Sequence, residues 1–167
     1  MAASKMHKSK KVFRYSLLVV FLLFVLIQFI PVDRSNPPVV REPNWDSPKT
    51  RDYASRACFD CHSNETKWPA YSYVAPVSWL VAGDVKEGRE QFNMSNWKPG
   101  KSDESAKEVR EGDMPMWQYT LMHPEAKFTD AEKNEFIAGL IATLGEKKEG
   151  SQKGKRDKSI RFTDEDD

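Results

Sequence analysis

The sequence predicts an all-α fold, a small helical domain that follows one apolar N-terminal helix. Apolar residues recur at helical spacing in several stretches of the chain. No segment shows the alternation of apolar and polar residues that a strand of useful length needs, and no internal repeat is present. With 167 residues, the chain has room for one compact domain plus tails.

The N-terminal region predicts a membrane anchor. Residues 1–14 are basic and are expected to stay in the cytoplasm. The apolar run over 15–32 is interrupted only by Ser16 and Gln28, and its 18 residues are about the length that a helix needs to cross a bilayer. A cleaved signal peptide is the alternative, but the exit from the run lacks an A-x-A-like site. We therefore expect a single-pass helix in the inner (cytoplasmic) membrane, with Asp33 onward on the periplasmic or extracytoplasmic side.

Two segments are expected to lie outside any folded core. Residues 33–48 contain four prolines, a composition that resists helix formation and favours extended conformations. We expect this segment to be a linker between the membrane and the domain. Residues 146–167 carry seven basic and seven acidic side chains with little apolar content, which predicts a disordered charged tail.

The domain is expected over 49–145, and its first half should contain two helices. A helix over about 49–60 would deliver Cys58 at its end. The segment 76–92 is the next, because Val81, Val85, Gly88 and Phe92 recur at intervals that form a one-sided helical stripe. Pro76 suits the first turn of this helix, and Ser78 is a nearby candidate for its cap.

The second half of the domain predicts two further helices. Residues 102–111 form a short polar helix that Gly112 is expected to end. The last helix, 129–144, has the clearest pattern, since Thr129 and Glu132 form a capping box and Gly145 stands where a C-terminal cap belongs. Its expected core face consists of Phe136, Ile137, Leu140, Ile141 and Leu144.

Cys58, Cys61 and His62 form a C-x-x-C-H motif that uses both cysteines of the chain. This spacing is typical of c-type haem attachment, in which two thiols form thioethers to the haem vinyl groups and the adjacent imidazole becomes the proximal ligand of the iron. The expected cofactor is one covalent haem c per chain. Export across the membrane agrees with the motif, because two free thiols this close would tend to oxidise in an oxidising compartment.

The sixth iron ligand decides what such a haem can do, and the chain offers several candidates for it. Met114 is favoured because Gly112 ends a helix just before it and Pro115 stiffens the backbone just after it. It also lies far enough beyond His62 for the chain to reach the opposite haem face. His123, Met116, Met122 and an open site are the alternatives, and Met94 is a more distant one.

Other residues around the motif have weaker interpretations. Seven aromatic residues, Trp68, Tyr71, Tyr73, Trp79, Trp97, Trp117 and Tyr119, are expected to wall a haem from water or to pack a core. Arg89 could hydrogen-bond a haem propionate, and Pro69 could shape the loop that accepts the second ring proton of His62. We find no hydrolase triad, phosphate loop or paired histidines for zinc, and no basic, aromatic-rich segment that would bind nucleic acid.

With these residues in place, the chain resembles the bacterial haem-binding domain family of short, membrane-anchored monohaem c-type cytochromes. The residues that carry the resemblance are Cys58-Phe59-Asp60-Cys61-His62 with the following Ser63 to Pro69, Ala75 to Leu80, Gly88-Arg89, Asn96-Trp97, Gly112-Asp113-Met114-Pro115, Tyr119 and His123 to Lys127. The likeness covers about residues 10–145. It implies a cytochrome c-like helical domain around one covalent haem, with Cys58 and Cys61 as attachment points, His62 as proximal ligand and Met114 as distal ligand.

These observations predict a membrane-anchored, single-electron carrier with a His/Met-ligated haem, which exchanges electrons with redox partner proteins and is not an enzyme. A haem-based gas or redox sensor, or a small-ligand binding protein with an open or displaceable sixth position, is the alternative. A peroxidase is a third possibility, for which His123 is the only evident distal acid–base residue.

Overall fold

The computed structural model of the chain describes residues 2–100 and 102–146, with the backbone alone for 2–9. The regular structure of these residues is entirely helical, and their one extended pairing is an isolated bridge between Arg41 and Asn96. The prediction of an all-α fold is therefore confirmed for this part of the chain. The predicted disordered tail, 146–167, lies outside the described residues except for Glu146.

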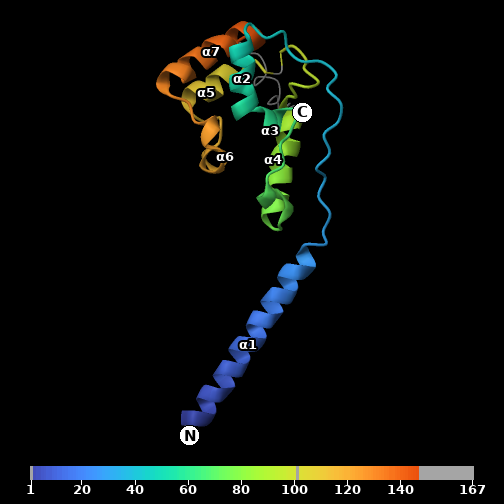
Figure 1. Cartoon of the computed structure of the whole chain (residues 1–167), viewed down its shortest axis with the longest axis vertical. Helices are drawn as coiled ribbons and strands as arrows, with labels where there is room; N and C mark the ends of the chain where they lie inside the picture. The colour runs from blue at the N-terminus through green and yellow to red at the C-terminus, as the bar shows by residue number, and fades with distance from the viewer. Residues whose placement is uncertain (1, 101, 147–167) are drawn as a thin grey trace, which may run out of the picture.

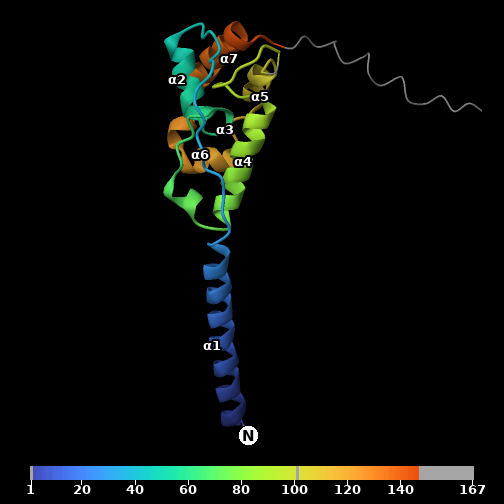
Figure 2. The ribbon, with the colours of Figure 1, turned by 90° about the vertical axis from the view of Figure 1, so that its right-hand side faces the viewer.

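A long helix, α1 (Ala2–Ile27), extends away from a compact helical domain (Figures 1 and 2). The helices of the domain are α2 (Pro48–Ala57), α3 (Phe59–His62), η1 (Ala70–Tyr73), α4 (Val77–Gln91), α5 (Ser105–Glu111), α6 (Trp117–Met122), η2 (Pro124–Ala126) and α7 (Asp130–Leu144), where η marks a 3-10 helix. Helices α2, α5 and α7 lie together at the end of the domain far from α1, and α4 extends from them toward α1 (Figures 1 and 2).

The core of the domain lies between α2, α5 and α7. Phe136 and Leu140 from α7 are fully buried, and they pack with Tyr53 from α2 and Val109 from α5. The rings of Tyr53 and Phe136 meet edge to face with their centroids 5.8 Å apart. The predicted core face of α7 is confirmed, because Leu144 is also buried and Ile137 and Ile141 pack against the same cluster.

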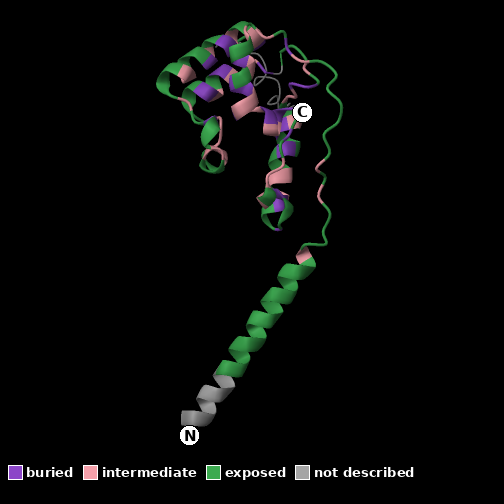
Figure 3. Cartoon of the chain, in the orientation of Figure 1, coloured by how far each residue is buried: buried purple, intermediate pink, exposed green. Residues whose placement is uncertain are grey.

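Helix α1 differs from the predicted transmembrane helix over 15–32. It ends at Ile27, and the next three residues form turns whose N–H groups bond three residues back, as in Phe29 N–H to Leu26 O at 3.2 Å. Pro31 cannot continue an α-helix without losing a hydrogen bond, which explains the early end. Among the described residues, none of the helices combines the length and the apolar character that crossing a bilayer requires. The side chains of α1 from residue 10 to residue 26 are exposed (Figure 3).

Two of the predicted helices have different limits in the structure. The first helix is broken at Cys58, whose φ of −127° and ψ of −33° separate α2 from α3. Helix α5 begins at Ser105 instead of at 102, because Ser102 is buried and accepts a hydrogen bond of 3.1 Å from Trp97 Nε1. The predicted end at Gly112 is confirmed, and its φ of 86° lies in the left-handed region that glycine tolerates.

Of the caps predicted for the other two helices, one is confirmed and one is wrong. The capping box of α7 is present, with the Thr129 side chain accepting from Glu132 N–H and the Glu132 side chain accepting from Thr129 N–H. For α4 the predicted cap is wrong. Pro76 takes the N-cap position without a side-chain hydrogen bond, and Ser78 is a buried residue inside the helix.

The proline-rich segment is extended, as expected, but it lies against the domain and is not a free spacer. The N–H groups of Val40 and Arg41 both donate to Ser95 O, at 2.8 and 3.0 Å, and Trp97 N–H donates to Arg41 O at 2.9 Å. Farther along, Arg51 of α2 holds Glu42 through two bonds of 2.7 and 2.8 Å. The segment therefore forms a strap of main-chain and side-chain contacts along one side of the domain.

Candidate haem-binding site

The C-x-x-C-H motif forms a single turn of helix after the break at Cys58. The carbonyl of Cys58 accepts hydrogen bonds from the N–H groups of Cys61 and His62, at 3.2 and 2.8 Å. Because residues three and four apart share a helix face, the two thiols and the imidazole lie on the same side of α3. Phe59 is buried in the core cluster, and it fixes this turn against the rest of the domain.

His62 is held by the backbone of α4. Its Nδ1 lies 2.9 Å from Gly88 O and 3.4 Å from Phe92 O, and its ring stacks on Phe92 at a centroid distance of 4.3 Å. A carbonyl oxygen can only accept, so Nδ1 carries the proton and Nε2 keeps its lone pair. Burial lowers the pKa of His62, although the two carbonyl contacts oppose this, so the ring is neutral at pH 7. A neutral imidazole with a free Nε2 is the form that binds a metal.

Gly88 permits this contact because it has no side chain. A Cβ at this position would stand 2.6 Å from Cys61 O and 3.1 Å from Cys61 Cβ, closer than real Cβ contacts come. The prediction that a loop shaped by Pro69 accepts the second ring proton of His62 is wrong, because the acceptor is Gly88 O. A signal for the true acceptor was present, since a glycine on the buried stripe of a helix indicates a close approach by another backbone.

A cavity of about 400 Å³ brings the predicted site residues together. Cys58, Cys61 and His62 line one part of it, and Met114, far away in the sequence, also lines it. Apolar parts of the wall come from three helices and from the segment after α4, through Ala57, Val109, Leu140, Phe92 and Met94. A volume of this size suits a cofactor. Most of the wall area is apolar, and the carboxyl residues Asp84, Glu87, Glu104 and Glu108 also line the cavity.

Met114 reaches the cavity from the loop after α5. The N–H groups of Gly112, Asp113 and Met114 all donate to Glu108 O, at 3.1, 3.0 and 3.2 Å. One carbonyl therefore fixes the start of this loop. Met116 lines the cavity as well, and the structure thus brings two thioether candidates to it. Met94 is a buried wall residue, whereas Met122 is 56% exposed and does not line the cavity.

His123 does not line the cavity. Its Nε2 lies 2.8 Å from Tyr71 Oη, its Nδ1 lies 3.1 Å from Glu125 Oε1, and its ring stacks on Tyr119 at 4.2 Å. Tyr119 does line the cavity, and its hydroxyl donates to Asp60 Oδ2 at 2.8 Å. In this arrangement both ring nitrogens of His123 already have partners, and its ring packs against the Tyr119 ring.

The other predicted haem contacts are mostly elsewhere. Of the seven aromatic residues singled out in the sequence, Tyr119 alone lines the cavity. Arg89 is also absent from its lining, because Arg89 Nε donates to Ser63 O at 2.7 Å and its terminal nitrogens hold Ser35 O, Asn36 Oδ1 and Thr66 Oγ1, each at 2.9 Å. Arg89 therefore joins the strap to the residues that follow His62, a role that sequence analysis missed.

The thiols lie in surroundings that keep them protonated. Burial raises the pKa of Cys58 to about 12, and the neighbouring Cys61 adds to the effect. Burial also raises the pKa of Cys61 to about 12, with smaller contributions from Asp84 and Asp60. Both groups are thus neutral thiols at pH 7, and they are weak nucleophiles until their surroundings change.

The residues present fit a haem. Two thiols, an imidazole with a free Nε2 and a methionine share one cavity, and this is the donor set of a c-type haem with His/Met ligation. Ser105 lines the same cavity, and its buried Oγ has no hydrogen-bond partner among the described residues. An unpaired hydroxyl on a cavity wall is expected where a bound group supplies the missing partner.

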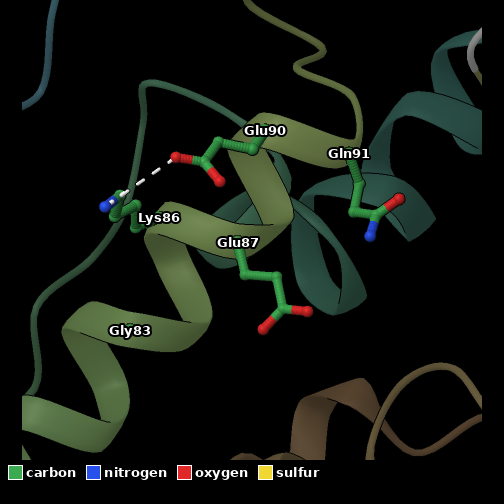
Figure 4. Close-up of a pocket in the computed structure, with 5 residues that line it drawn as sticks. All are labelled: Gly83, Lys86, Glu87, Glu90 and Gln91. Carbon is green, nitrogen blue, oxygen red and sulfur yellow. Dashed lines mark ion pairs between the residues drawn. The ribbon is translucent and has the colours of Figure 1, made fainter.

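A second hollow, of about 570 Å³, lies on α4 and is no competitor for this role. All five of its lining residues come from one helix, Gly83, Lys86, Glu87, Glu90 and Gln91 (Figure 4). Its surface is polar, and Lys86 pairs loosely with Glu90 at 3.9 Å. It contains no thiol, imidazole or thioether, so it is an open helix surface with no cofactor ligands.

Comparison with known proteins agrees with the geometry of the cavity. The family model described as the haem-binding domain matches residues 22–142, which include the strap, the C-x-x-C-H turn, Met114 and most of α7. No curated protein and no solved structure matches the chain. Because the family match covers well over half of the sequence, this chain belongs to the haem-binding domain family.

Proposed function

We propose that the chain is a membrane-associated, monohaem c-type cytochrome that carries one electron at a time between redox partner proteins. The observation that carries this proposal is the meeting of Cys58, Cys61, His62 and Met114 in one cavity. Each of these side chains has a defined task in a His/Met-ligated c-type site.

Cys58 and Cys61 would hold the cofactor through two thioether bonds, and His62 Nε2 and Met114 Sδ would ligate the iron. A haem held in this way supplies an iron centre that accepts and releases a single electron. Gly88 O fixes the orientation of His62 through the bond of 2.9 Å from Nδ1, and this bond also makes Nε2 a better electron donor.

Apolar side chains shield part of the cavity wall from water. Phe92 stacks on His62, and Val109 and Leu140 are buried residues of the core that also line the cavity. Close packing around His62 limits its movement when the charge of the iron changes, which is what fast electron exchange needs. We assign no catalytic residue, because His123, the candidate for a distal acid–base group, does not line the cavity and is engaged with Tyr71 and Glu125.

We also propose that α1 associates with a membrane, with the haem domain on the outer side. The support for this is the apolar surface of α1, where Leu18, Phe21, Leu22 and Phe24 are between 43% and 61% exposed. Basic residues precede this surface, a charge pattern that favours the cytoplasmic side for the N-terminus. Covalent haem attachment generally takes place outside the bacterial cytoplasmic membrane, so the motif and this orientation agree.

A haem-based sensor remains the alternative, because Met114 belongs to a loop and is only half-buried. The two functions differ in whether the sixth ligand stays on the iron. We expect the reduced wild-type protein to resist carbon monoxide and the Met114→Ala variant to bind it, as followed by visible absorption. Rapid and complete binding by the wild type would favour the sensor.

A further inference from the structure

The end of the domain nearest to α1 carries exposed apolar side chains that no other described part of the chain covers. Tyr73, Val74, Val77 and Leu80 are 59%, 46%, 40% and 68% exposed, and we call these four residues the apolar tip. They belong to the end of η1, the turn that follows it, and the first turn of α4. Single apolar residues on a surface are ordinary, but a group of four confined to one end indicates a contact.

The end of α1 is fixed to the apolar tip. The Gln28 side chain forms a pair of hydrogen bonds with the backbone of Ala75, in which Oε1 accepts from Ala75 N–H at 2.9 Å and Nε2 donates to Ala75 O at 3.2 Å. Ala75 lies between Val74 and Val77 in the sequence, so these bonds join the end of α1 to the segment that carries the apolar tip. The two views of the ribbon show the lower end of α4 directly beside the upper end of α1 (Figures 1 and 2). Phe29 and Ile30, next to Gln28, are 79% and 52% exposed.

A tyrosine and an arginine border the same surface. The Arg34 guanidinium lies 4.6 Å from the centre of the Tyr73 ring, and Arg34 Nε donates to Ser72 O at 3.0 Å. Aromatic residues with a polar group collect at the boundary between lipid chains and water, and arginine there attracts anionic headgroups. Together with the adjacent valines and leucine, this tyrosine and arginine are therefore typical of a surface that lies in a lipid headgroup layer.

We propose that the apolar tip inserts into the lipid surface beside α1 and so holds the haem domain in one orientation on the membrane. The proposal rests on the membrane association of α1 proposed above. The strap strengthens it, because hydrogen bonds from Val40, Arg41 and Asn36 leave little free chain between α1 and the domain. Gly88, which orients His62, is eight residues beyond Leu80 on α4, so the haem site would stand about 12 Å farther along the helix axis from the lipid. A partner would then reach the haem close to the membrane surface.

The experiment is lipid photolabelling of the full-length holoprotein in vesicles of phosphatidylcholine and phosphatidylglycerol. The lipid carries a diazirine near the glycerol end of one acyl chain, and the labelled peptides are identified by mass spectrometry after digestion. We expect label on α1 and on the peptide that contains 73–80, and none on α7. Label on α1 with none on 73–80 would overturn the inference and leave the association of α1 intact. An absence of label on both would overturn the two proposals together.

A pair of variants tests whether the side chains of the tip are responsible. In the double variant Val77→Glu/Leu80→Glu, label on 73–80 should fall to the level of the α7 peptide while label on α1 stays unchanged. The control is Ala138→Glu, which places a carboxylate on an exposed position of α7 and should change neither peptide. Unchanged absorption of the haem in all variants checks that the domain is folded. Equal labelling of 73–80 in the double variant and the wild type would contradict the proposal.

Discussion

His62 Nδ1 donates a hydrogen bond of 2.9 Å to the carbonyl oxygen of Gly88, and this bond ties the proposed iron ligand to α4. The same glycine lies so close to Cys61 that a Cβ would stand 2.6 Å from the Cys61 carbonyl oxygen. One backbone position of α4 therefore sets the tautomer of the imidazole and the distance between α3 and α4. The orientation of His62 and the packing around the proposed haem site should therefore depend on the tautomer and on this distance.

The Gly88→Ala variant tests this relationship. Because both contacting groups belong to the backbone or to Cβ, the helices must separate, and we expect the free energy of unfolding to fall by about 1–3 kcal/mol. The matched control is Gly83→Ala on the same helix, where a Cβ meets nothing within 4 Å. There the loss of glycine should raise stability by about 0.5–1 kcal/mol. Urea unfolding followed by circular dichroism measures both, and a Gly88→Ala protein as stable as the wild type would refute the packing argument.

Three variants separate the candidates for the sixth ligand. Met114→Ala should abolish the methionine-to-iron charge-transfer absorption of the oxidised protein, because the proposed axial sulfur is lost. Met116→Ala should keep this absorption, although Met116 lines the same cavity. His123→Ala should keep it too, since His123 contacts Tyr71, Glu125 and Tyr119 and does not line the cavity. Loss of the band in Met116→Ala with retention in Met114→Ala would transfer the role to Met116.

The two thiols should show a strong pH dependence before haem is attached. Their pKa of about 12 in the folded chain compares with about 9.0 for a free thiol, so the thiolate fraction at pH 8 is about a thousandfold lower. We expect the alkylation rate of the folded apo protein to keep rising about tenfold per pH unit up to pH 11. The folded state holds these protons more tightly than the unfolded chain does, so stability should fall as the pH rises from about 9 toward 12. An alkylation rate that levels off near pH 9 would show ordinary thiols.

Arg89→Lys tests the strap. Lysine keeps the charge, but its single ammonium group cannot reach all four oxygen atoms that the Arg89 guanidinium binds. The buried Ser63 carbonyl would then lose its hydrogen-bond donor. We expect a loss of about 1–3 kcal/mol in the free energy of unfolding and faster proteolysis within 33–47. The control is Arg110→Lys, whose side chain makes an exposed ion pair with Glu146 and should cost no more than about 0.5 kcal/mol. Equal protease resistance of Arg89→Lys and the wild type would mean that the strap is held without Arg89.

Local signals in the sequence predicted the parts of this structure that local interactions form. The capping box of α7, its apolar stripe and the glycine after α5 each act within a few residues, and all three are present in the structure. The short helix α6 was missed, because it has six residues and none of them is buried, so no apolar period marks it. The early end of α1 was missed because the apolar run continues past the residue where the helix stops.

Contacts between distant segments could not be predicted in this way. The strap is held by backbone groups of Val40, Arg41 and Ser95, and backbone hydrogen bonds carry no sequence signature. The acceptor for His62 is a carbonyl 26 residues away, and the glycine at position 88 was its one signal in the sequence. The four proposed haem-site residues were nevertheless identifiable, since thiol, imidazole and thioether side chains are few in this chain and their chemistry limits their roles.

The mass of the denatured, acid-extracted full-length protein tests the central claim most directly. When the chain is produced with export and haem attachment, we expect its mass to exceed that of the polypeptide by one haem, with both cysteines unavailable to alkylating agents. The double variant Cys58→Ser/Cys61→Ser should have the mass of the polypeptide alone. Wild-type protein that has the bare polypeptide mass after extraction, with two alkylatable thiols, would contradict covalent attachment at this site.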